Sequence, residues 1–214
     1  MPALYLLRHG QASFGTDDYD VLSDLGRQQA AVAAEELRRR EVRTPVVISG
    51  TLRRQRETAQ IAASVLGAEL HDPDPRLNEF DAHAMVDAHL GRAGATDGMP
   101  SSQFQIHLDE AMTDWMSETD GTWEQFSGGA VDALRELAAT LPRGADAVVA
   151  TSAGVTAAVV GRLLGADAAG VIAMNRVSVN ASVTTIVAGS RGLSVVTFND
   201  HAHFLGDRTL LTNR

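Results

Sequence analysis

Short apolar runs, each followed by a segment with helical spacing, recur along this chain. The runs are Ala3 to Leu7, Val46 to Ile48 and Ala147 to Ala150, and the segments that follow them are residues 25–40, 52–66 and 155–164. A continuous apolar run fits a strand covered on both faces, and strands that alternate with helices pair in parallel. The pattern predicts an α/β fold, a three-layer sandwich with a mostly parallel central sheet and helices on both faces.

The strand-and-helix pattern is interrupted from about Asp81 to Thr122, where polar and glycine-containing stretches replace it. We interpret residues 81–122 as an inserted helical or loop cap within a single domain of residues 1–214. Helical patterning resumes over residues 123–141. Near the end of the chain, residues 182–187 and 193–198 are separated by a glycine-containing turn, which predicts a hairpin at one end of the sheet.

Composition narrows the functional classes. A chain of 214 residues with 44% hydrophobic residues is long enough to bury a sizeable core. A formal charge of −9 argues against general binding to nucleic acid or to an anionic membrane. The absence of cysteine excludes disulfides, thiolate metal sites and cysteine nucleophiles.

With no basic, apolar leader and no stretch near the ~18 apolar residues of a membrane span, we expect a cytoplasmic protein. Assembly as a homodimer is left open.

The tripeptide Arg8-His9-Gly10 directly follows the first apolar run. Ligands of open α/β sheets collect at the carboxyl ends of the strands, so these residues are expected at a binding site. They provide a planar cation, a nucleophile or base, and a residue that allows close backbone approach. Those are the requirements of phosphoryl transfer, although the tripeptide alone also occurs by chance in ordinary loops.

A second anion-binding feature follows the second apolar run. Residues 49–59 place a Ser-Gly-Thr turn before an arginine-rich helix, whose N-terminus offers free N–H groups and a favourable dipole. An arginine in its first turn could reach the ligand of Arg8. In the alternative interpretation, Arg53, Arg54 and Arg56 only solvate an exposed helix face.

Taken together, these segments resemble the histidine phosphatase superfamily, which includes the phosphoglycerate mutases. Residues 7–10 resemble its nucleophile motif, residues 22–30 its Leu-Thr-x-x-Gly-x-x-Gln-Ala segment, and residues 49–59 its Ser-x-x-Leu-x-Arg-x-x-x-Thr-Ala motif. Residues 77–79 match the segment that contributes the proton donor, and residues 199–203 resemble a common family ending. Counted back from Thr58 and Ala59, Arg54 rather than Arg53 falls on the phosphate-binding arginine.

The resemblance implies a mechanism that needs neither a cofactor nor a metal. His9 would be the nucleophile that accepts the phosphoryl group, and Arg8 and Arg54 would bind its oxygens. One nitrogen of His9 must be unprotonated to attack, so the other is expected to donate a hydrogen bond, most simply to a backbone carbonyl. Glu79 would protonate the leaving alcohol and then activate water. On the residues alone, Glu79 could instead be a surface carboxylate beside Arg76.

The chain departs from the family pattern in the turn after the third apolar run. Aligned on Gly154-Val155, Ser152 occupies the place of the family's second, phosphate-binding histidine. A serine hydroxyl can still donate, and the N–H groups of Ala153 and Gly154 would face the phosphate at a helix N-terminus. Substitution of Ser152 by histidine should hold or increase turnover if the serine is a weakened donor, whereas a sharp loss would show a pocket rebuilt around the smaller side chain. His83 is a candidate for the missing imidazole, against the alternative of a solvent-facing cap residue.

Three functions are considered. The first is a phosphomonoesterase acting on a small organic phosphate ester, the expected small-molecule partner. The second, a phosphoglycerate-mutase-like phosphotransferase, is disfavoured because Ala12 and Gly15 stand where polar groups are expected. The third is a protein that binds a phosphoester without turnover, which Ser152 keeps open. The spacings Asp87-x-His89 and His201-x-His203 also suggest metal ligands, but cap surface and family ending explain them better, and no metal site is predicted.

Overall fold

The protein was analysed as a computed structural model that describes residues 1–13 and 20–213. Its strands form one six-stranded sheet in the order β3-β2-β4-β1-β5-β6. In chain order these are β1 (Ala3–Arg8), β2 (Val46–Ser49), β3 (Glu69–Leu70), β4 (Ala147–Thr151), β5 (Val183–Gly189) and β6 (Gly192–Asp200). The four strands β3, β2, β4 and β1 are parallel, whereas β5 and β6 form an antiparallel hairpin at one edge. The fold is therefore α/β with a mostly parallel sheet, as the sequence predicts.

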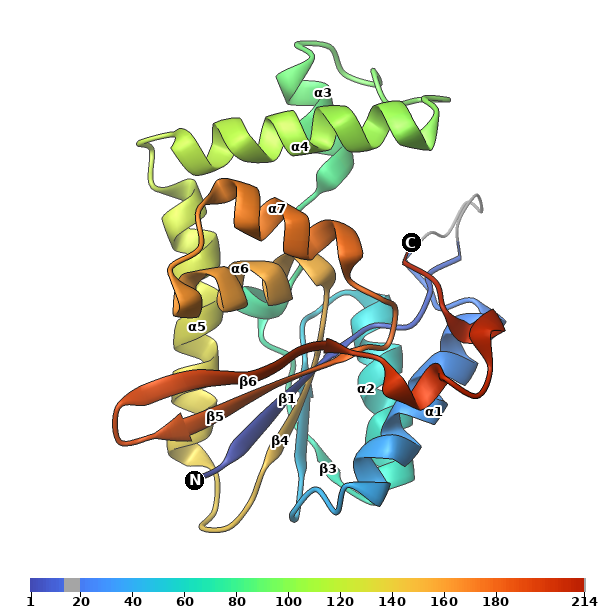
Figure 1. The fold of residues 1–214 in the computed structure, drawn as a ribbon, viewed down its shortest axis with the longest axis vertical. Coiled ribbons are helices and arrows are strands. Elements are labelled where there is room, and N and C mark those ends of the chain that lie inside the picture. Colours follow the sequence, from blue (N-terminus) through green and yellow to red (C-terminus); the bar gives the residue numbers. More distant parts are fainter. Residues whose placement is uncertain (14–19, 214) are drawn as a thin grey trace.

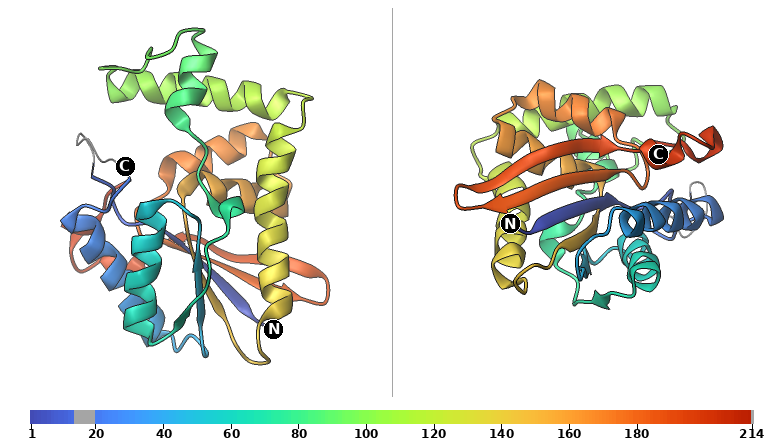
Figure 2. Two further views of the ribbon diagram at one scale, coloured as in Figure 1. Left: turned by 180° about the vertical axis from the view of Figure 1, so that it is seen from behind. Right: turned by 60° about the horizontal axis from the view of Figure 1, so that its bottom comes forward.

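The helices of the described residues lie on both faces of this sheet (Figures 1 and 2). They are α1 (Asp24–Arg39), α2 (Arg53–Leu66), α3 (Ala82–His89), α4 (Ser101–Ser117), α5 (Thr122–Thr140), α6 (Ala153–Leu164) and α7 (Ala168–Val177), with short 3-10 turns η1 (Pro75–Leu77), η2 (Ala202–Phe204) and η3 (Arg208–Leu210). None of the helices in the described residues has the length and apolar character that crossing a membrane requires.

Two hydrophobic clusters fill the spaces between the layers. On one face, small residues of α1 and α2 such as Ala33 and Ala62 pack against Leu7 and Val148. On the other face, side chains from α5 and α6 pack against Leu4, Leu6 and Val149. Alternate residues of each central strand thus serve opposite faces, which is why these strands are apolar throughout.

The segment predicted as a cap contains α3, α4 and the loop between them. These helices lie at one end of the molecule, beyond α7 (Figure 1), and share a separate hydrophobic cluster with it through Val86, Leu108, Met112 and Ile172. Helix α4 buries Leu108, Ala111 and Met112, whose spacing places them on one side of the helix.

Two elements were not anticipated from the sequence. Strand β3 has only two residues, both exposed, and exists because Val46 and Val47 of β2 provide a parallel partner. Helix α7 begins at Ala168, and the preceding Asp167 caps it by accepting a hydrogen bond from the N–H of Gly170, a capping signal that was present in the sequence.

Candidate active site

The site is built at the carboxyl ends of β1, β4 and β2, which are neighbours in the sheet. Arg8 pairs with Thr151 at the end of the β1 and β4 ladder, and the N–H of His9 donates to the Thr151 carbonyl at 2.8 Å. The N–H of Gly50, after β2, donates to the carbonyl of Ala150 at 3.2 Å. The three turns that carry the predicted motifs therefore leave the sheet side by side.

His9 is buried and held in one orientation. Its Nδ1 lies 2.7 Å from the carbonyl oxygen of Gly10, so Nδ1 carries the proton and donates, which leaves the ring's lone pair on Nε2. This is the backbone contact that the sequence analysis expected. Burial is the main cause that holds the pKa of His9 well below its usual range, and the charges of Arg8 and Arg54 lower it further. A neutral imidazole is the form that can act as a nucleophile.

The turn that carries His9 depends on close packing between Gly10 and Gly26. A Cβ atom on Gly10 would lie 2.1 Å from the carbonyl oxygen of Gly26, well inside van der Waals contact. Gly26 is in the first turn of α1, which Ser23 caps by accepting a hydrogen bond from the Gly26 N–H at 3.0 Å. The loop after β1 is thereby fixed onto the start of α1, and the N–H of Gly10 also donates to Thr58 of α2 at 3.2 Å.

Arg54 joins α2 to this imidazole. Its Nε donates to Nε2 of His9 at 3.2 Å, and Nη1 lies 2.5 Å from an oxygen of Asp20. The other oxygen of Asp20 accepts from the N–H of Arg53 at the start of α2, at 2.8 Å. Of the candidate arginines, Arg54 is thus in contact with His9. The carboxylate of Asp20 shows that the N-terminus of α2 and Arg54 together bind an anionic group. Sequence reasoning missed Asp20.

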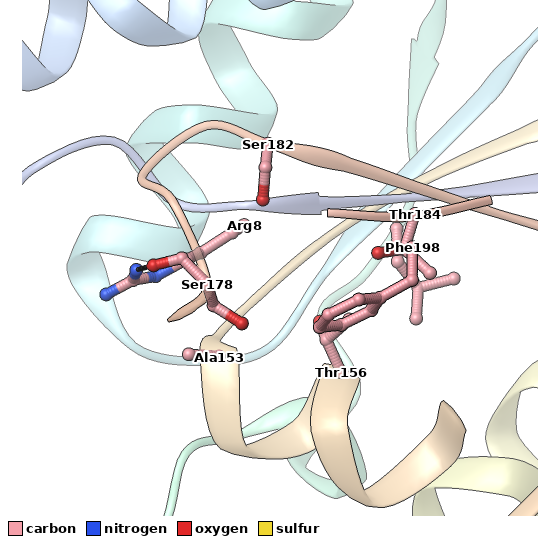
Figure 3. Close-up of a pocket in the computed structure, with 8 residues that line it drawn as sticks. Arg8, Ala153, Thr156, Ser178, Ser182, Thr184 and Phe198 are labelled. Carbon is pink, nitrogen blue, oxygen red and sulfur yellow. Dashed lines mark hydrogen bonds between the residues drawn. The ribbon is translucent and has the colours of Figure 1, made fainter. Parts of the chain in front are cut away.

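Arg8 extends from the end of β1 towards the segment between α7 and β5. Its Nη1 donates to the carbonyl of Ser178 at 2.5 Å, and the side chain is 9% exposed. Figure 3 shows its guanidinium beside a small hollow that Ala153 and Ser182 also line. His9 and Glu79 do not line that hollow, so it lies beside these two side chains and is not the place where they meet.

Glu79 follows η1 and reaches the N-terminus of α6. Its Oε2 accepts a hydrogen bond from the N–H of Gly154 at 2.9 Å. Burial is the main cause that raises the pKa of Glu79, while the Gly154 N–H and the charges of Arg54 and Arg8 act in the opposite direction. The carboxyl group therefore belongs to the same cluster as both arginines. Arg76, its neighbour in sequence, pairs instead with Asp74 and Glu136.

Ser152 is completely buried, and its hydroxyl has a partner that sequence reasoning missed. The amide of Gln55 donates to Ser152 Oγ at 2.8 Å and to the carbonyl of Leu77 at 3.0 Å. Gln55 lies next to Arg54 on α2 and is also completely buried. The sequence held one signal for this contact. Gln55 directly follows the predicted phosphate-binding arginine and lies on the side of α2 that faces the sheet. Beside Ser152, Ala153 begins α6 and is 7% exposed.

The remaining histidine predictions have the following positions. His83 is in α3, where its ring packs against Phe104 with ring centres 4.8 Å apart. The spacing Asp87-x-His89 does not bring these two side chains together as metal ligands, because Asp87 accepts hydrogen bonds from backbone N–H groups of the following loop. His201 and His203 each contact a different backbone carbonyl through one ring nitrogen. Ala12 is buried after β1, and Gly15 lies outside the described residues.

A mostly parallel sheet with an imidazole, two guanidinium groups and a carboxyl group at one edge is an arrangement that can bind and transfer a phosphoryl group. The family model for the histidine phosphatase superfamily (branch 1) matches residues 4–201. The chain therefore belongs to the histidine phosphatase superfamily. A search of curated proteins found no significant match.

Solved structures share the fold over nearly the whole chain. YhfR from Bacillus stearothermophilus is 20% identical with a TM-score of 0.72, covering 95% of this chain and 99% of that one. A mycobacterial glucosyl-3-phosphoglycerate phosphatase in complex with inorganic phosphate is 24% identical with a TM-score of 0.68, covering 95% and 99%. Phosphoserine phosphatase from Entamoeba histolytica, in complex with 3-phosphoglyceric acid, is 18% identical with a TM-score of 0.67, covering 96% and 100%.

Proposed function

We propose that this chain is a phosphomonoesterase that hydrolyses a small organic phosphate ester through a phosphohistidine at His9. The observation that carries the proposal is the pair of contacts on the His9 ring. Nδ1 donates a hydrogen bond to the Gly10 carbonyl, and Nε2 faces Arg54, a cation that can bind a phosphate oxygen. The mycobacterial relative with bound inorganic phosphate supports the same class of ligand.

In the first step, the Nε2 lone pair of His9 attacks phosphorus and the bond to the ester oxygen breaks. Arg8 and Arg54 bind the phosphoryl oxygens, with Arg54 turning from Nε2 and Asp20 towards the substrate. Burial raises the pKa of Glu79, which favours its protonated form, and in that form Glu79 gives its proton to the leaving alcohol oxygen. The products of this step are a neutral alcohol and phosphohistidine.

In the second step, water attacks phosphorus and the bond between nitrogen and phosphorus breaks. Glu79, now ionised, takes a proton from the water and returns to its starting state. Inorganic phosphate leaves, and His9 is again neutral with the proton on Nδ1. No proton or electron is left over, so the cycle requires only the ester and water.

Helices α3 and α4 lie beyond α6 and α7, where they would serve as the cap that selects the alcohol part of the substrate.

Binding of a phosphoester without turnover is the second candidate function. It is favoured by Ser152, because the hydroxyl is buried and bonded to Gln55 where the family pattern has an imidazole. Loss of one donor to a transition state costs on the order of 10²–10³ in rate. The two functions share the same residues and differ in turnover.

The test is phosphate release from a panel of esters, comprising a sugar phosphate, phosphoglycerate, phosphoserine and an aryl phosphate. We expect the wild type to hydrolyse at least one ester and His9→Ala to lose on the order of 10³-fold or more of kcat. Arg54→Ala should raise KM and lower kcat. Arg56→Ala is its matched control, because Arg56 lies on the same helix and is exposed.

The outcomes of this test distinguish the proposed functions. Unchanged hydrolysis by His9→Ala would exclude His9 as the nucleophile. Phosphate binding by the wild type without hydrolysis of any ester would identify the binding protein. Transfer that depends on a bisphosphate primer, with no net phosphate release, would identify the mutase activity. Alkaline quenching after reaction with labelled ester should recover the label on the wild-type protein and not on His9→Ala.

A further inference from the structure

A group of metal-ligating side chains lies away from the phosphoryl-transfer residues, between α3 and α4. It consists of His89, at the end of α3, and of His107 and Glu110 on α4. One ligand atom from each of the three residues lies within 4.8 Å of the others. Two ring nitrogens and a carboxylate oxygen are a ligand set typical of zinc and of related transition metals, whereas calcium and magnesium prefer oxygen alone.

The helices bring these side chains together through ordinary packing. His107 and Glu110 are three residues apart on α4, so they share one face of the helix. Val86 of α3 and Leu108 and Met112 of α4 are buried in one cluster, which fixes the two helices against each other. The site therefore rests on two well-packed helices and not on the loop that joins them.

The distances to Glu110 fit ligands around a common ion. Nε2 of His89 lies 3.5 Å from Oε2 of Glu110, and Nδ1 of His107 lies 3.1 Å from the same oxygen. Ligands bound about 2.0–2.2 Å from zinc in a tetrahedral arrangement are separated by roughly 3.3–3.5 Å. A ring nitrogen of each histidine also lies within 4.8 Å of the other, so side-chain rotations can bring all three ligand atoms to one ion.

A second observation concerns the other nitrogen of His89. Its Nδ1 lies 3.0 Å from a carboxylate oxygen of Asp114, one helical turn beyond Glu110 on α4. A carboxylate that accepts from the second ring nitrogen fixes the tautomer of a metal-bound histidine and increases its basicity. Asp114 therefore orients His89 so that Nε2, the nitrogen that faces Glu110, carries the lone pair.

We infer that His89, His107 and Glu110 form a binding site for a divalent transition metal such as Zn²⁺, with Asp114 as the residue that positions His89. Glu110 and His89 are solvent-accessible, which leaves an entry path and a fourth position for water. The ion joins α3 to α4 across the loop of residues 90–100. It plays no part in the phosphoryl-transfer mechanism, and the inference is independent of the proposed function.

The test is calorimetric titration of the chelator-treated full chain with ZnCl2 in a buffer that does not bind zinc. We expect one Zn²⁺ per chain for the wild type. His107→Ala and Glu110→Gln should each weaken binding at least about tenfold, and Asp114→Ala should weaken it by roughly 10–100-fold as expected for a partner of a ligating histidine. His71→Ala is the matched control, because His71 is exposed and also lies near a glutamate, Glu69.

A second measurement keeps the inference testable if a variant is unstable. Zn²⁺ should raise the Tm of the wild type and of His71→Ala, and should not raise that of the double variant His89→Ala/His107→Ala. Co²⁺ should give the visible absorption of a low-coordinate site only in proteins that keep both histidines. Equal Zn²⁺ affinity in the wild type and the double variant would overturn the inference, as would an equal loss in His71→Ala.

Discussion

Replacement of Ser152 by histidine tests whether the interior has been rebuilt around the smaller side chain. Ser152 and Gln55 are both completely buried, and the Gln55 amide donates to Ser152 Oγ at 2.8 Å. An imidazole at position 152 would have to enter the space that this amide occupies. We therefore expect Ser152→His to destabilise the protein and to lower turnover, although it restores the residue type of the family pattern.

The expected cost has two parts. Extra side-chain volume in a well-packed interior costs about 1–3 kcal/mol. Displacing the amide of Gln55 from its buried partner leaves polar groups unsatisfied, which costs about 1–3 kcal/mol more. The combined loss of about 2–6 kcal/mol is large beside the ~5–15 kcal/mol that stabilises a typical domain.

The assay is urea unfolding followed by circular dichroism, combined with kcat for the best ester of the panel. The informative comparison is the double variant Gln55→Ala/Ser152→His, in which removal of the amide makes room for the ring. Because the two residues are in contact, their effects should be non-additive by about 1–3 kcal/mol in favour of the double variant. Ser102→His, at an exposed position of α4, is the control for histidine itself.

A Ser152→His variant that alone is as stable and as active as the wild type would refute a pocket rebuilt around the smaller side chain. That result would mean that the turn before α6 keeps room for an imidazole and that Ser152 is only a weaker donor. A double variant no more stable than the sum of its parts would likewise show that Gln55 does not occupy the space in question.

Two further predictions concern the neighbouring groups. Gly154→Ala should lower kcat by roughly 10²-fold, because the added Cβ would lie 2.2 Å from Oε1 of Glu79 and 2.4 Å from Cε1 of Phe80 and would displace the carboxyl group. Gly128→Ala, where a Cβ meets nothing closer than 3.8 Å, should leave kcat unchanged in the same assay. The pKa of His9 is lower in the folded than in the unfolded protein, so the unfolded state binds more protons and stability should fall as pH decreases through about 6.5 towards the folded value. In unfolding titrations from pH 7.5 downwards, His9→Asn should lose less stability than the wild type, and parallel pH curves for the two proteins would contradict the assigned burial.

The residues of the reacting cluster differ in how far the sequence predicted them. Arg8 and His9 were placed by their position directly after an apolar run, because parallel strands end at one edge of a sheet and bring following residues together. The same argument brought the arginines of residues 53–56 near them, and the resemblance to the family motif selected Arg54. Glu79 follows no such run. Its assignment came from resemblance alone, and its burial against the N–H of Gly154 depends on how the chain crosses from η1 to α6.

The sequence by itself determined the alternation of strands and helices, the hairpin and the order of the motifs, because these follow from local periodicity and turn chemistry. Tertiary structure alone decided which polar groups meet. Gln55 and Ser152 are far apart in sequence, as are His89 and Asp114, and each pair forms only because packed helices bring distant segments into contact. A hydrogen bond depends on positions to within fractions of an ångström, and periodicity along the chain carries no such information.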